Sequence, residues 1–172
     1  MMGGNVAAGL LLAVCAFMLA FVPHRTALIG VVVSVLICVA VVVSGLALPV
    51  KWAFAGCWIS LIVTAMLVYF PQGLRPWPQH ARFILAPIVV APIIATNAGF
   101  WAGQVIMAEG DWHDAMLVLP VWLVIIPAIV CVARGWALPV RIVTSWLLAV
   151  ALLVGSIPYL VVHPGYEPDH KE

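Results

Sequence analysis

The chain has 172 residues, of which 66% are hydrophobic and only 8% are charged, and its mean hydropathy is +1.24. Globular domains contain about 45–50% apolar and about 25% charged residues, so this composition excludes a soluble fold and a disordered chain. Seven Lys and Arg against six Asp and Glu leave no basic surface for a nucleic acid. The composition therefore indicates a polytopic membrane protein, whose first partner is the lipid bilayer.

Six apolar segments follow one another along the chain. A helix that crosses a membrane needs about 20 apolar residues, and clusters of Pro, Gly and charge mark where such helices end. The segments lack the period-2 alternation of a transmembrane β-strand. The first of them has neither the basic start nor the cleavage site of a signal peptide. We therefore predict an all-α membrane protein with six transmembrane helices, over residues 4–22, 27–47, 52–70, 83–107, 115–133 and 138–162.

Charge is distributed unevenly between the loops that six helices would place on opposite sides. One side carries five arginines, and the other carries two lysines and all six acidic residues. The arginines are Arg25, Arg75, Arg82, Arg134 and Arg141. Because basic loops stay in the cytoplasm, this bias predicts a bacterial inner-membrane protein with both termini outside. The tryptophans near predicted helix ends, as expected of an aromatic belt, are Trp52, Trp77, Trp112 and Trp136.

A short motif, Gly-x-Ala-Leu-Pro-Val-basic, occurs at 45–51 and again at 135–141, with five of its seven positions identical. The same offset of 90 residues aligns Gly9 with Gly99. We therefore predict two three-helix halves, 1–81 and 82–172. Because each half has an odd number of helices, the halves would insert with opposite orientation, as in the inverted repeats of many transporters. The motif also has a simpler interpretation as a tight turn, in which Gly ends one helix and Pro begins the next.

Uncharged polar residues inside the predicted helices are concentrated in the fourth, which contains Thr96, Asn97 and Gln104. Asn97 and Gln104 are seven residues apart, nearly two helical turns, and therefore share a face. These three residues are candidates for a substrate-binding or pore surface that takes a small solute. The alternative is that they form hydrogen bonds between helices, each worth on the order of 1 kcal/mol.

The same segment contains features that affect helix packing. Gly99 and Gly103 form a stripe of small residues at which another helix can approach closely. Pro87 and Pro92 would free backbone carbonyl groups, so we expect a kinked or partly broken helix that faces the protein interior.

Ionisable residues all lie near predicted helix ends or in loops, so the membrane interior lacks the groups that acid–base or nucleophilic catalysis requires. We therefore expect no catalytic residues, no cofactor and no enzymatic activity. The four cysteines lie within predicted helices and are interpreted as packing residues. The acidic loop at 109–114 contains His113, but its spacing matches no known metal-ligand pattern, so no metal is assigned.

Two functions fit these features. The first is a small permease or channel-like transporter for a small solute, acting as a homo-oligomer because six short helices enclose little volume. It rests on the internal repeat and on the polar fourth helix. The alternative is a non-catalytic membrane subunit or assembly factor of a larger membrane complex. It is favoured by the lack of buried charge and by the short loops.

Overall fold

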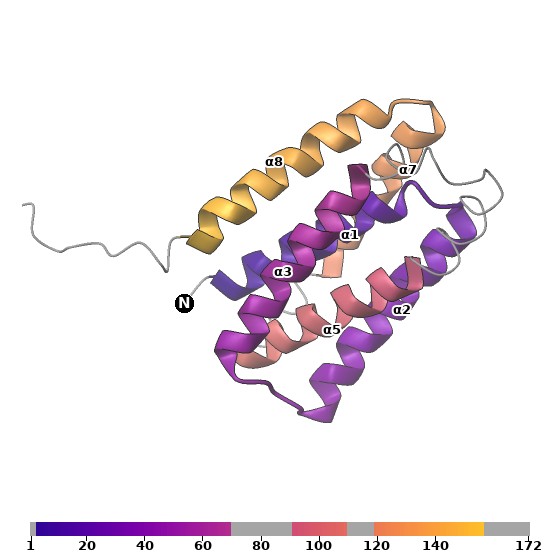
Figure 1. The fold of residues 1–172 in the computed structure, drawn as a ribbon. Coiled ribbons are helices and arrows are strands. Elements are labelled where there is room, and N and C mark those ends of the chain that lie inside the picture. The colour runs from indigo at the N-terminus through magenta and orange to yellow at the C-terminus, as the bar shows by residue number, and fades with distance from the viewer. Residues whose placement is uncertain (1–2, 70–90, 110–118, 157–172) are drawn as a thin grey trace, which may run out of the picture.

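The structure is a computed structural model that describes residues 3–69, 91–109 and 119–156. These residues form a bundle of helices and include no strand (Figure 1). The all-helical fold predicted from composition is thus confirmed. The elements are α1 (Gly3–Leu19), α2 (His24–Ser44), α3 (Val50–Tyr69), α5 (Ala91–Glu109), the 3₁₀ helix η3 (Leu119–Val124), α7 (Ile125–Ala133) and α8 (Ala137–Ser156).

Three of the described helices have the length and apolar composition of membrane-spanning segments. They are α2, α3 over Val50–Val68, and α8. Two shorter apolar helices, Val6–Leu19 and Pro120–Ala133, belong to the first and fifth predicted segments. Parts of the last three predicted segments, at 83–90, 115–118 and 157–162, lie outside the described residues. Six transmembrane helices therefore stay a prediction, whereas three helices of membrane-spanning length and composition are present in the described part of the chain.

Prolines in the first turn of a described helix are Pro92 in α5, Pro120 in η3 and Pro139 in α8. Pro127 lies where α7 continues directly from η3. The first N–H groups of a helix have no partner within it, so a residue without an N–H is tolerated there. Pro92 lies in the first turn of α5 as described, and the segment before Ala91 lies outside the described residues, so the expected kink stays a prediction. Pro87 lies outside the described residues.

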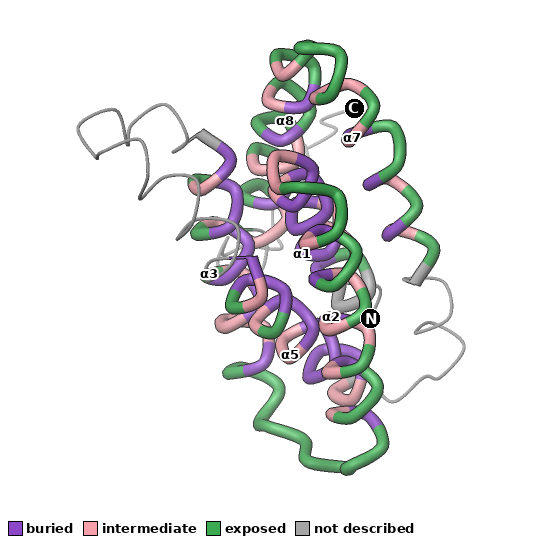
Figure 2. Tube along the Cα trace, turned by 90° about the vertical axis from the view of Figure 1, so that its right-hand side faces the viewer, coloured by how far each residue is buried: buried purple, intermediate pink, exposed green. Residues whose placement is uncertain are grey.

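Helix α1 fills the centre of the bundle. It contacts α3, α5, η3, α7 and α8, and more weakly α2. Eight of its side chains are at most 2% exposed: Ala7, Ala8, Leu11, Leu12, Val14, Cys15, Ala16 and Leu19. A helix that is apolar around its whole circumference is suited to such a position. Figure 2 shows these buried residues along α1, with exposed residues on the outer turns and in the connecting segments.

Helix α5 runs parallel to α2 and antiparallel to α3. Gly99 lies against Ser34 of α2, and Gly103 lies one turn further along both helices, against Cys38. In contrast, Asn97 contacts Ser60 of α3, whereas Gln104 contacts the segment that precedes α3. The three helices therefore form a layer in which α5 lies between two neighbours (Figure 1).

Both copies of the repeated motif end a helix with a left-handed glycine. Gly45, after α2, has a φ of 67°, and Gly135, after α7, has a φ of 79°. These are the only residues with positive φ in the described part of the chain. The turn at Gly135 is a Schellman motif. The N–H of Gly135 donates to the carbonyl of Val132 at 3.0 Å, and the N–H of Trp136 donates to the carbonyl of Cys131 at 2.8 Å.

The two copies differ in the segment after the glycine. Beyond Gly45, residues 46–49 are extended and α3 begins at Val50, whereas α8 begins at Ala137, only two residues after Gly135. The copies also lie at opposite ends of the bundle. Leu48 contacts the last third of α5, whereas the guanidinium of Arg141 lies 5.7 Å from the ring of Phe21, just beyond α1. Late α1 adjoins early α5, because Leu19 and Ala95 both lie next to Gly30.

Replacing Gly135 by alanine should destabilise the chain by about 1–2 kcal/mol, because a Cβ disfavours the left-handed conformation. The measurement is unfolding of the detergent-solubilised protein by a denaturing detergent, followed by circular dichroism. Gly155→Ala is the matched control, since Gly155 is helical and a Cβ there would lie 3.4 Å from the Trp58 ring, an ordinary contact. Equal stability of Gly135→Ala and the unmodified protein would contradict this account of the turn.

Candidate site on helix α5

Asn97 lies at the centre of a small polar cluster between α3 and α5. Its amide nitrogen donates a short hydrogen bond to the hydroxyl of Ser60, and its amide oxygen accepts one from the indole N–H of Trp101 at 3.0 Å. Thr64 donates to the backbone carbonyl of Ser60 at 2.7 Å. Both ends of the Asn97 amide are thus bonded within the chain.

Trp101 can approach α3 closely because Gly56 has no side chain. A Cβ on Gly56 would overlap the six-membered ring of Trp101. The indole also packs edge-on against Phe100, with ring centroids 5.1 Å apart and an interplanar angle of 78°. The ring is therefore fixed on three sides, by Gly56, Phe100 and the amide of Asn97, and this fixes the amide in turn.

Gln104 has a different role from Asn97. Its side chain is only 2% exposed. Its amide nitrogen donates to the carbonyl of Leu46 and its amide oxygen accepts from the N–H of Leu48, each at 2.8 Å. One side chain thus pairs with a donor and an acceptor of the linker between α2 and α3, as a neighbouring strand would. This pairing holds the linker extended.

The glycines of α5 face α2. A Cβ on Gly99 would overlap the backbone carbonyl of Ser34, and one on Gly103 would lie 3.0 Å from the carbonyl of Cys38 and from Val41. The helices α2 and α5 are therefore in backbone contact along this stripe, which only residues without a side chain allow.

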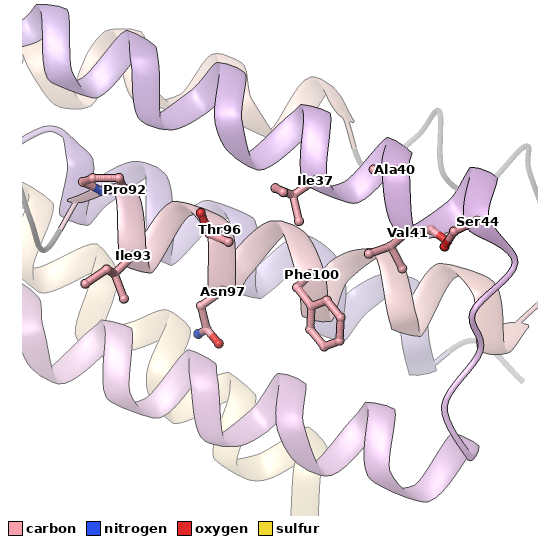
Figure 3. Close-up of a pocket in the computed structure, with 9 residues that line it drawn as sticks. All are labelled: Ile37, Ala40, Val41, Ser44, Pro92, Ile93, Thr96, Asn97 and Phe100. Carbon is pink, nitrogen blue, oxygen red and sulfur yellow. The ribbon is translucent and has the colours of Figure 1, made fainter.

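A groove with a volume of about 780 Å³ runs beside this contact, lined by nine residues of α2 and α5. Figure 3 shows its lining residues following one another from Pro92, near the start of α5, to Ser44, the last residue of α2. Most of its lining is aliphatic or aromatic, including Ile37, Ile93 and Phe100. Thr96 and Asn97 contribute the polar atoms near its middle (Figure 3).

The candidate residues are thus divided between two places. Thr96, which is exposed, and Asn97, which is half-buried, both line the groove. Gln104 is not among the lining residues and instead binds the linker. Ser60 and Trp101 were not anticipated. The position of Trp101 one turn after Asn97 was the available signal for the indole bond, but the sequence contains no signal that pairs Asn97 with Ser60.

The described residues include no group of three or more His, Cys, Asp or Glu side chains. The acidic loop beyond Glu109, the arginine-rich segment 75–82 and the polar C-terminal segment lie outside the described ranges. Within the described part, the groove can therefore offer apolar contact and neutral hydrogen bonds. Its lining contains no titratable side chain.

Comparison with known proteins adds no further assignment, because no protein-family model, curated protein or solved structure matches the chain.

Proposed function

We propose that this chain is a non-catalytic integral membrane protein that acts as a helical subunit or assembly factor of a larger membrane complex. The observation that carries this proposal is that Asn97 and Gln104, the two amides of α5, are both bonded within the chain. Each amide thus already has one donor and one acceptor partner within the chain, which accounts for its position between helices without a solute. The two amides form hydrogen bonds that hold α5 against α3 and against the linker between α2 and α3.

The packing of the bundle gives further support. Helix α1 occupies the axis with side chains that are almost completely buried. Space in the described part of the chain opens instead on the outer side of α2 and α5, as the groove. A surface of this kind is suited to contact within the membrane, with a partner or with lipid, and much less to passage of a solute through one copy.

The second candidate is a small permease that works as a homo-oligomer, and the placement of the repeat favours it. The two motif copies lie at opposite ends of the bundle, as two halves of opposite orientation require. The equivalent glycines also have related surroundings. Gly9 faces Val121 of η3, and Gly99 faces Ser34 of α2. In the proposed duplication, the 90-residue offset makes α2 the equivalent of the η3–α7 segment, so the two glycines face equivalent elements. In this case the solute path would lie between copies.

We also propose that the arginine-rich end faces the cytoplasm of a bacterium, with both termini outside. Arg25 follows the turn that contains Phe21, and Arg141 lies over the Phe21 ring. Arg134 ends α7 in the turn just before α8. Lys51 lies beyond the linker at the opposite end. Three described arginines at one end agree with the positive-inside rule.

Purification of the tagged chain in mild detergent, at native expression, distinguishes the two candidates. A stoichiometric complex with a larger membrane assembly is the result expected for a subunit. A chain that elutes alone, or as a defined homo-oligomer, would contradict that proposal and would direct attention to transport assays in liposomes.

Asn97→Leu should destabilise the protein by about 1–2 kcal/mol, because it leaves Ser60 and Trp101 without their polar partner. For a subunit, we expect recovery of the complex to fall while reconstituted chain shows no solute flux, with or without the substitution. Thr96→Val is the matched control, since it removes a hydroxyl one residue away in the exposed part of the groove. Flux that is present in liposomes and is abolished by Asn97→Leu would instead establish the permease.

A further inference from the structure

We draw no further inference here: the strongest candidate, the apolar groove between α2 and α5, carries nothing because no contact in the described part of the chain shows what covers it.

Discussion

Replacing Gly99 by alanine should destabilise the protein by about 3 kcal/mol or more, the largest effect we expect of any single methyl group in this chain. A Cβ at this position would overlap the backbone carbonyl of Ser34. A flexible side chain could move aside, but a helix backbone cannot, so α2 and α5 would have to separate. Overpacking of a close interior contact costs about 1–3 kcal/mol, and more when the backbone must shift.

Gly9→Ala is a demanding control for this prediction. Gly9 is the equivalent of Gly99 in the proposed repeat, yet a Cβ there would lie 3.9 Å from a methyl group of Val121, an ordinary contact. We expect Gly9→Ala to be neutral, or slightly stabilising because alanine favours helix. Unfolding of both variants by a denaturing detergent, followed by circular dichroism, measures the difference. Equal stabilities would show that α2 and α5 do not meet in backbone contact.

The sequence predicts the helices of this fold better than it predicts their neighbours. Long apolar segments separated by Pro and Gly identify α2, α3 and α8 within a few residues, because composition and helix ends are local properties. The central position of α1 was not predicted. All the segments are apolar around their circumference, so periodicity does not distinguish a helix at the axis from one that faces lipid.

Proline shows a related limit. Pro92 is expected to kink a helix that begins near residue 83, and the described α5 contains it in the first turn, while residues 83–90 lie outside the described part of the chain. A proline costs little at a helix start and much in a helix interior, but the residue type is the same in both cases. Only the position of the first turn decides between them. In this chain that position depends on where α5 meets α2 and α3, which is tertiary information.

The sequence predicts which residues belong to the candidate site but not which residues they contact. Spacing alone places Asn97 and Gln104 on one face of α5. Their partners, Ser60 and the 46–48 backbone, are 37 to 58 residues away in the sequence. Such distant pairing cannot be read from a single apolar sequence. The sequence therefore leaves both a solute surface and hydrogen bonds between helices open for these residues.

Gln104→Met should destabilise the protein by about 2 kcal/mol and should act first on the linker between α2 and α3. Methionine has nearly the length and volume of glutamine, so packing is retained while both hydrogen bonds are lost. The carbonyl of Leu46, on a residue that is 73% exposed, can bind water instead. Leu48 is only 38% exposed, so we assign most of the cost to its N–H.

Hydrogen exchange resolves this effect from a general loss of stability. In Gln104→Met, the amide of Leu48 should exchange much faster, while the amides in the middle of α1 keep their protection. The second copy of the motif supports this reasoning. In the proposed repeat, the equivalent of Gln104 is Val14, 90 residues earlier, and the valine side chain cannot form a hydrogen bond with the second copy. There the helix begins at Ala137, the equivalent of Ala47, and an extended linker is absent. Unchanged exchange at Leu48 in the variant would mean that the linker is extended for a reason other than Gln104.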